Sequence, residues 1–402
     1  MQDALIYDGV RTPFGRHGGS LSALRPDDLL GRTLRALVQR NGFAPEDYEE
    51  VLAGCTNQAG EDSRNVARHG ALLAGLPVEV SGQTVNRLCG SGLAAVMDAA
   101  RAIRSGEGQL FLAGGVESMS RAPYVLGKAD SPFARNQPLY DTVIGSRFPN
   151  PWIAQTYGNH SMPETADNVA HDLGLGRAES DAYAARSQAR YGDAQARGFY
   201  DEEILGIEVP QGRKLPPLLV DRDEHPRPGT DSDKLGRLSP LFEGGVVTAG
   251  NASGLNDGAA ALIVGSRAAG ERAGVRPRGR LLAGAVAGVE PRVMGLGPVP
   301  ASRKALERAG LSLDQMDVIE INEAFAVQVL GCVKQLGLSA DDSRLNINGG
   351  AIAIGHPLGA SGARLTLTAL RQLEASGGRY ALVTMCIGVG QGIACVIERL
   401  EG

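Results

Sequence analysis

Short apolar runs alternate with amphipathic stretches along this chain, and that alternation is the feature that most constrains its fold. Residues 4–7, 51–55 and 110–115 have the composition of buried strands, and a helical pattern begins near residue 26. Strands that alternate with helices are typical of layered α/β proteins. The sequence therefore predicts an α/β fold.

The alternation stops between about residues 120 and 247, where prolines, aromatic residues and charges become frequent. It resumes at about residue 251, and a second α/β unit runs from about residue 281 to the end. We predict an N-terminal half formed by residues 1–119 and 248–272, an inserted loop domain at 120–247, and a C-terminal half at 273–402.

Each α/β unit contains a glycine-flanked segment that leads into a helix with an apolar stripe. The first segment is NRLCGSG at residues 86–92, and the second spans residues 348–359. The stripes follow at Leu93, Val96, Ala100 and Ile103, and at Leu365, Leu367 and Leu370. This shared pattern predicts a duplicated fold with its active site between the halves.

Charge and cysteine content exclude several classes of function. The formal net charge of -5 offers no basic field for nucleic acid. No stretch approaches the roughly 18 apolar residues of a membrane span, and no secretory leader is visible, so we expect a cytoplasmic protein. Five widely spaced cysteines without a C-x-x-C pair argue against a disulfide framework and a structural metal site.

Cys89 is a candidate nucleophile because it precedes a helix and has small neighbours. Backbone N–H groups and the positive helix end stabilise a thiolate, so the sequence predicts a lowered pKa for Cys89. Its own N–H is also placed to donate into an oxyanion hole. The alternative is a structural cysteine buried in a tight turn.

Three further residues carry chemistry in this pattern. His356 lies in a glycine-rich turn, which suits a base, although a satisfied core histidine is the alternative. Cys386 ends an apolar strand and precedes a glycine-rich loop, where a thiol can act as acid or base. Asn322 lies where a strand meets a helix, either facing a crevice or capping the helix.

Together these segments resemble the signatures of the thiolase family, in order. They are NRLCGSG at 86–92, NEAF at 322–325, NGG at 348–350 with GHP at 355–357, and CIGVGQG at 386–392. The resemblance covers nearly the whole chain. It implies a duplicated five-layered αβαβα body with an inserted loop domain, and a homo-oligomer, usually a tetramer or a dimer.

The resemblance also implies roles for the reactive residues. Cys89 would accept the acyl group, His356 would deprotonate Cys89, and Cys386 would move a proton at the substrate α-carbon or the coenzyme A sulfur. Asn322, through a water, would serve one oxyanion hole with His356. The N–H groups of Cys89 and Gly388 would form the other hole.

Coenzyme A is implied as a cosubstrate, and no permanently bound cofactor or metal is implied. Arg227 matches the family's position at the nucleotide end of coenzyme A, and Ser253 the position at the pantetheine. The resemblance places the remaining pocket residues at Met162, Met294, Ala324 and Phe325.

Three segments resemble the 3-oxoadipyl-CoA thiolases of aromatic-compound catabolism, at residues 60–65, 144–148 and 161–168. Thiolases specific for acetoacetyl-CoA commonly have a histidine where this chain has Ser161, next to His160. A 3-oxoadipyl group ends in a carboxylate, which an arginine binds by charge-assisted hydrogen bonds. Arg64 and Arg147 are the candidates, and their alternative is a structural ion pair with Glu61, Asp62 or Asp141.

The sequence therefore predicts thiolytic cleavage of a 3-oxoacyl-CoA through an acyl-Cys89 intermediate, with 3-oxoadipyl-CoA as the expected substrate. One alternative is a general acetyl-CoA acetyltransferase. A second is a decarboxylating condensing enzyme of the ketoacyl synthase type. The presence of Cys386 in its glycine-rich loop argues against this type. The third is a noncatalytic acyl-CoA or lipid carrier.

Overall fold

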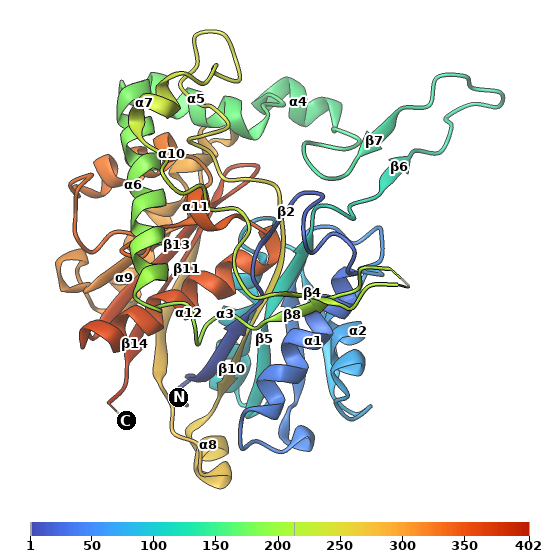
Figure 1. Ribbon diagram of the computed structural model, residues 1–402, viewed down its shortest axis with the longest axis vertical. Coiled ribbons are helices and arrows are strands. Elements are labelled where there is room, and N and C mark those ends of the chain that lie inside the picture. Colours follow the sequence, from blue (N-terminus) through green and yellow to red (C-terminus); the bar gives the residue numbers. More distant parts are fainter. Residues whose placement is uncertain (1, 213, 402) are drawn as a thin grey trace.

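A central sheet of ten strands organises residues 2–212 and 214–401, the part of the chain that the computed structural model describes (Figure 1). The strands are β1 (Leu5–Arg11), β2 (Gly15–Arg16), β3 (Glu50–Gly54), β4 (Ser81–Val85), β5 (Leu110–Ser118), β10 (Asn256–Gly265), β11 (Gly279–Gly288), β12 (Val318–Ile321), β13 (Tyr380–Ile387) and β14 (Gln391–Arg399). Their order is β12-β13-β14-β11-β1-β10-β5-β3-β4, and β2 pairs with β10.

The sheet consists of two parts that meet along a short contact. Between β1 and β11 only two residue pairs are in register, Leu5 with Arg280 and Ile6 with Gly279. By contrast, β10 pairs with β5 along its length, although more than 130 residues separate them in the chain. The first part of the sheet therefore combines β1, β3, β4 and β5, which precede the 120–247 segment, with β10, which follows it.

Helices cover both parts of the sheet and separate them. They are α1 (Pro26–Gln39), α2 (Val66–Ala74), α3 (Ser91–Ser105), α8 (Arg267–Ala273), α9 (Pro298–Ala309), α10 (Ala326–Leu336), α11 (Ala351–Ile354) and α12 (Leu358–Ser376). Helices α3 and α12 pack against each other and against strands of both parts. Helices α1 and α2 cover one outer face, and α9 and α10 the other. The predicted αβαβα layering is confirmed.

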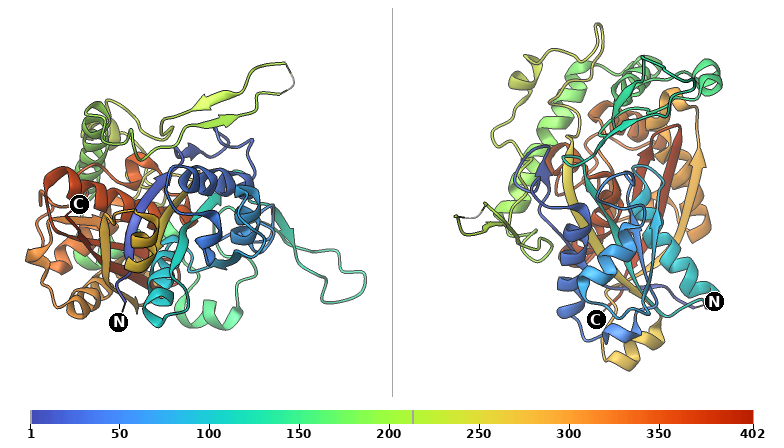
Figure 2. Two further views of the ribbon diagram at one scale, coloured as in Figure 1. Left: turned by 90° about the horizontal axis from the view of Figure 1, so that it is seen from below. Right: turned by 90° about the vertical axis from the view of Figure 1, so that its right-hand side faces the viewer.

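The segment between β5 and β10 adds two hairpins and four helices. These elements are β6 (Tyr124–Leu126), β7 (Leu139–Asp141), α4 (Pro151–Tyr157), α5 (Met162–Leu173), α6 (Arg177–Ala196), β8 (Ile207–Val209), β9 (Leu218–Val220) and α7 (Ser232–Gly236). The β6–β7 hairpin extends away from the layered body, whereas the base of the β8–β9 hairpin packs beside α1, with Ile207, Val209 and Val220 buried there (Figure 2). Helices α5 and α6 pack on α10 instead. Of the helices in the described ranges, none is long and apolar enough to cross a membrane.

Glycines allow the two central helices to come into backbone contact. A Cβ atom added to Gly92 on α3 would lie 2.4 Å from the carbonyl oxygen of Gly359 on α12. One added to Gly362 would lie 2.2 Å from the backbone nitrogen of Leu93. Any larger residue would force the helices apart. This contact holds the turn before α3, which carries Cys89, beside the turn before α12, which carries His356.

Candidate active site

The turn that carries Cys89 is fixed by the first residue of α3. The hydroxyl of Ser91 accepts a hydrogen bond from the N–H of Arg87 at 2.8 Å and donates to the carbonyl of Leu88 at 2.6 Å. Leu88 itself adopts a left-handed conformation, with φ of 47°. A Cβ atom on Gly90 would lie 2.6 Å from the side chain of Ile387. The turn is therefore pressed against the end of β13.

The predicted lowering of the Cys89 pKa is wrong. Burial, with a smaller contribution from the charge of Glu117, raises the pKa of this thiol to about 11. The N–H groups of Gly388 and Cys89 are directed at the sulfur and lower the pKa, but they do not offset the loss of hydration. Although Cys89 keeps partial exposure, it rests as an uncharged thiol at neutral pH.

His356 is held by hydrogen bonds on its ring and on its backbone. Ring atom Nδ1 lies 2.6 Å from the hydroxyl oxygen of Ser361, and the backbone N–H donates to Asn256 Oδ1 at 2.9 Å. Burial, with a contribution from the positive charge of Arg364, lowers the pKa of His356 to about 3. The imidazole is therefore uncharged at physiological pH and has a lone pair to accept a proton.

Asn322 faces this imidazole. Its amide Nδ2 lies 3.3 Å from His356 Nε2, and its backbone N–H donates to the carbonyl of Thr384 on β13 at 3.0 Å. The alternative of a helix-capping role is wrong, because α10 begins at Ala326 with Phe325 at its N-cap. The buried Oδ1 of Asn322 accepts no hydrogen bond from the described protein atoms. This oxygen is therefore able to bind the water that the family resemblance implies at Asn322.

Cys386 and Gly388 approach Cys89 from the end of β13. Cys386 is buried, and this burial raises the pKa of its thiol well above the ordinary value, with a further contribution from nearby Cys89. The chain then turns through Val389 and Gly390, both with positive φ, which directs the N–H of Gly388 at the Cys89 sulfur. The two thiols are thus neighbours, and Asn322 hydrogen-bonds both to β13, the strand that carries Cys386, and to the imidazole of His356.

Apolar side chains line the space beside Cys386. Cys386 packs in one buried cluster with three predicted pocket residues, Met294, Ala324 and Phe325. The fourth, Met162 at the start of α5, is partly exposed, and its sulfur would lie 3.6 Å from a Cβ atom added to Gly388. The predicted pocket residues thus lie close to Cys386 and to Gly388.

The two predicted coenzyme residues lie along one edge of this region. The N–H of Ser253 donates to the carbonyl of Ala324 at 2.9 Å, which places Ser253 beside the Asn322 segment. His225 packs against Gly254, because a Cβ atom there would lie 2.3 Å from the imidazole. Arg227, two residues further on, has an exposed side chain. The segments of Ser253 and Arg227 are therefore neighbours.

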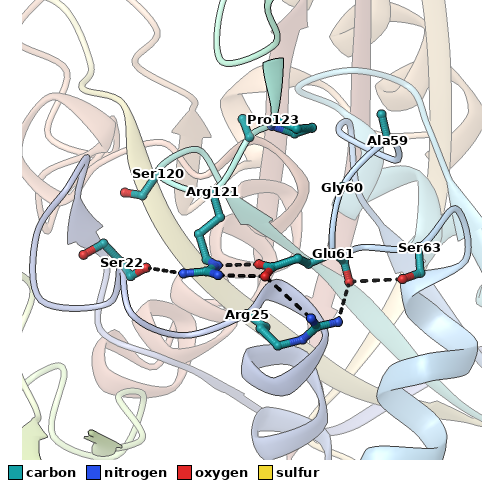
Figure 3. A pocket seen from close by; sticks show the side chains of 10 residues that line it. Ser22, Arg25, Ala59, Gly60, Glu61, Ser63, Ser120, Arg121 and Pro123 are labelled. Atoms are coloured by element: carbon teal, nitrogen blue, oxygen red, sulfur yellow. Dashed lines mark hydrogen bonds and ion pairs between the residues drawn. The ribbon is translucent and has the colours of Figure 1, made fainter. Parts of the chain in front are cut away.

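Arg64 directly follows Ser63, which lines the pocket drawn in Figure 3. It is exposed and adopts a left-handed conformation, with φ of 67°. In this pocket Glu61 receives two hydrogen bonds from Arg121, and Arg25 lies 3.5 Å from the same carboxylate. The alternative interpretation, an ion pair between Arg64 and Glu61 or Asp62, is not supported, because no such pair is present among the described residues.

Arg147 is connected to the segment of the nucleophile by a series of hydrogen bonds. Its guanidinium donates to the carbonyl of Thr142 at 2.7 Å, and the Thr142 hydroxyl accepts from Asn57 Nδ2 at 3.0 Å. The adjoining carbonyl of Thr56 accepts from Asn86, three residues before Cys89. Arg147 pairs with no carboxylate in the described ranges, Asp141 included.

Glu117 is a buried residue of the site that the sequence analysis missed. Its carboxylate accepts hydrogen bonds from the N–H groups of Thr56 and Asn57, both at 3.1 Å, and of Gly359 at 2.9 Å. It thereby ties the end of β5 to the first turn of α12. A glutamate inside the otherwise apolar run of β5 was the available signal, because a buried charge needs partners.

Comparison with models of known sequence families identifies the family of this chain. The thiolase N-terminal domain matches residues 4–268, and the thiolase C-terminal domain matches residues 275–399. The chain belongs to the thiolase family. Membership makes it an acyltransferase, and it agrees with a site built around two thiols and an imidazole.

Relatives and solved structures of this family match over their full length. The chain is 58% identical over 401 residues to a beta-ketoadipyl-CoA thiolase of Pseudomonas aeruginosa, covering 99% of this chain and 100% of the relative. It is 57% identical to the 3-oxoadipyl-CoA/3-oxo-5,6-dehydrosuberyl-CoA thiolase of Escherichia coli K12, covering 100% of both. The crystal structure of an acetyl-CoA acetyltransferase from Bacillus anthracis superposes with a TM-score of 0.93 at 38% identity, covering 100% of this chain and 99% of that one.

No candidate metal site is present among residues 2–212 and 214–401. No group of three or more histidine, cysteine, aspartate or glutamate side chains is arranged to hold a metal ion in those ranges.

Proposed function

We propose that this thiolase cleaves 3-oxoadipyl-CoA with coenzyme A, giving succinyl-CoA and acetyl-CoA. The observation that carries the substrate is the 57–58% identity, over the full length, to relatives that bear this activity in their names. The acetyl-CoA acetyltransferase of known structure is less similar, at 38%. The convergence of Cys89, His356 and Cys386 supports the reaction type.

The first half of the reaction forms an acyl-Cys89 intermediate. His356 Nε2 takes the proton of the Cys89 thiol as the sulfur attacks the 3-oxo carbon of the substrate. The bond between C2 and C3 then breaks, and C2 takes a proton from the Cys386 thiol as acetyl-CoA leaves. Because Cys89 rests as a thiol and His356 as a neutral base, this proton transfer accompanies attack rather than preceding it.

The second half returns the site to its resting state. The Cys386 thiolate takes the proton of the coenzyme A thiol, whose sulfur attacks the acyl carbon. Cys89 leaves and recovers its proton from His356. The N–H groups of Gly388 and Cys89 support one developing oxyanion, and a water held by Asn322 together with His356 supports the other.

We assign the terminal carboxylate of the substrate to Arg147 rather than to Arg64. Neither arginine pairs with a carboxylate in the described ranges, so the choice rests on position. The Arg147 segment packs on Asn57, next to the Thr56 carbonyl that accepts from Asn86 near the nucleophile. Arg64 follows Ser63 at a different pocket, in which Glu61 already forms ion pairs with Arg25 and Arg121. A free guanidinium near the acyl site is suited to a carboxylate.

A substrate panel on three variants tests this function. We expect wild type to prefer 3-oxoadipyl-CoA over acetoacetyl-CoA in kcat/KM, and Arg147→Ala to lose roughly 10- to 100-fold for 3-oxoadipyl-CoA only. Arg135→Ala, at the exposed tip of the β6–β7 hairpin, is the matched control. A selective loss in Arg64→Ala would move the assignment to Arg64. Preference for acetoacetyl-CoA would establish the general acetyltransferase instead.

Mass spectrometry separates the enzyme from the remaining alternatives. Incubation with acetyl-CoA is expected to leave one acetyl group on Cys89 and none on Cys89→Ser. No adduct on wild type would favour a noncatalytic carrier, and turnover that requires decarboxylation would favour a condensing synthase. Coenzyme A is the proposed cosubstrate with no permanently bound cofactor, and the proposed assembly is a cytoplasmic homotetramer, which light scattering tests.

A further inference from the structure

His356 lies between two side chains that restrict which ring nitrogen carries its proton. On one side, Nδ1 lies 2.6 Å from Ser361 Oγ, within the first turn of α12. On the other side, Nε2 lies 3.3 Å from the amide nitrogen of Asn322. All three side chains are buried, so bulk water does not compete for these contacts.

Ser361 has one hydroxyl hydrogen and two neighbours. The first neighbour, the carbonyl of Pro357, lies 2.9 Å from Oγ and can only accept a hydrogen bond. When the hydroxyl donates to Pro357, Ser361 Oγ is left as an acceptor. A neutral imidazole can satisfy that acceptor only by carrying its proton on Nδ1.

The contact at the other nitrogen agrees with this assignment. The structure directs the amide nitrogen of Asn322 at the ring, and because this nitrogen is a donor, Nε2 accepts from it. The ring does not carry protons on both nitrogens, because burial and the charge of Arg364 lower its pKa and keep it uncharged. Nε2 therefore keeps the lone pair that would take the Cys89 proton.

We propose that Ser361 is a positioning residue that fixes the Nδ1–H tautomer of His356 and so leaves Nε2 as the base. The proposal deepens the function proposed above and rests on it. Ser361 touches no reacting atom. Its contribution is to make the reactive tautomer the resting one, so that no proton needs to change nitrogen before Cys89 attacks.

The test replaces the hydroxyl and reads the tautomer directly. Solid-state NMR of protein labelled with 15N in its histidine rings distinguishes a protonated from an unprotonated Nδ1. With six histidines in the chain, the His356 signals are identified by their loss in His356→Asn. We expect Nδ1–H in wild type, and a mixture or the Nε2–H form in Ser361→Ala.

Kinetic measurements provide a second test of the role of Ser361. In Ser361→Ala we expect the rate of Cys89 acylation and kcat to fall about 10- to 100-fold, with KM for the acyl-CoA changed less than about twofold. The matched control is Thr366→Val on the same helix, which loses an equivalent buried bond, from the hydroxyl to the Gly362 carbonyl at 2.9 Å. It should retain the Nδ1–H form and acylate at a rate within about twofold of wild type.

An unchanged Nδ1–H tautomer with normal acylation in Ser361→Ala would overturn the proposal, and so would an Nε2–H ring in wild type. If Ser361→Ala does not fold, Ser361→Cys takes its place, because a thiol is a much weaker acceptor of similar shape. The NMR reading needs no turnover. A missing acyl adduct on Cys89 would therefore refute the proposed function without deciding the tautomer.

Discussion

At the scale of single residues, the resting ionisation of Cys89 separates two ways of activating a thiol. A preformed thiolate–imidazolium pair requires a thiol pKa near or below neutrality, whereas burial raises the pKa of Cys89 to about 11 and lowers that of His356 to about 3. The thiol is the neutral form below its raised pKa, and the imidazole is the neutral form above its lowered one. Both groups are therefore uncharged between about pH 5 and pH 9.

Alkylation by iodoacetamide, quantified at the Cys89 peptide, tests this state. At pH 7 about one thiol in 10,000 is ionised, so the rate should rise about tenfold per pH unit up to pH 10, in wild type and in His356→Asn alike. Acylation by acyl-CoA, which needs the base, should be lost in His356→Asn. A wild-type plateau below pH 8 that disappears in this variant would show a preformed ion pair.

The sequence could predict the candidate residues of the site, but not their environment. Glycine-flanked motifs single out Cys89, His356 and Cys386 because such turns are local features of the chain. The pKa of Cys89 depends on burial by segments hundreds of residues away, so a local reading gave the wrong sign. Ser361 was missed for a related reason, since a serine in a helix gains meaning only when an imidazole is seen beside it.

At the scale of elements, the site depends on how closely α3 and α12 approach. We expect Gly92→Ala to destabilise the protein by about 1–3 kcal/mol and to reduce kcat more than tenfold, because its Cβ would lie 2.4 Å from the Gly359 carbonyl oxygen. Urea unfolding and steady-state kinetics measure the two effects. Displacing either helix moves Cys89 relative to His356.

The control for this substitution is Gly192→Ala in α6. An added Cβ there meets no atom within 4 Å, and alanine favours a helix over glycine by about 0.5–1 kcal/mol. We expect Gly192→Ala to be neutral or stabilising, with normal activity. Equal stability and activity in Gly92→Ala would show that the helix contact does not set the site geometry.

Hydrophobic periodicity predicted the strands and helices of the layered body well, because each buries one face or is buried on both. It predicted less for residues 120–247, where α6 runs for 20 residues with a weakly apolar face. The three-part domain division stays a prediction. Asn322 shows the limit at an element's end: strand β12 was expected, yet helix α10 begins four residues later, at Ala326.

At the scale of the whole molecule, a buried charge cluster joins segments that are distant in the chain. Arg11 on β1 contacts Glu203 at 2.5 Å and Asp223 at 2.6 Å, and none of these side chains has measurable solvent exposure. Tyr191 of α6 donates to Asp223 at 3.1 Å, and Thr368 of α12 donates to Glu203 at 3.1 Å. The cluster therefore links β1, the 120–247 segment and the central helix α12.

Removing the cation at the centre of this cluster should uncouple those segments. We expect Arg11→Met to lower the free energy of unfolding by about 3–5 kcal/mol, because two carboxylates stay buried without their partner. Urea unfolding measures the change. Arg101→Met, which breaks an exposed ion pair with Asp98 one turn away on α3, should cost no more than about 1 kcal/mol. Equal costs would mean that water reaches Glu203 and Asp223 once Arg11 is gone, and that packing of the apolar layers, rather than this cluster, holds the 120–247 segment against the sheet.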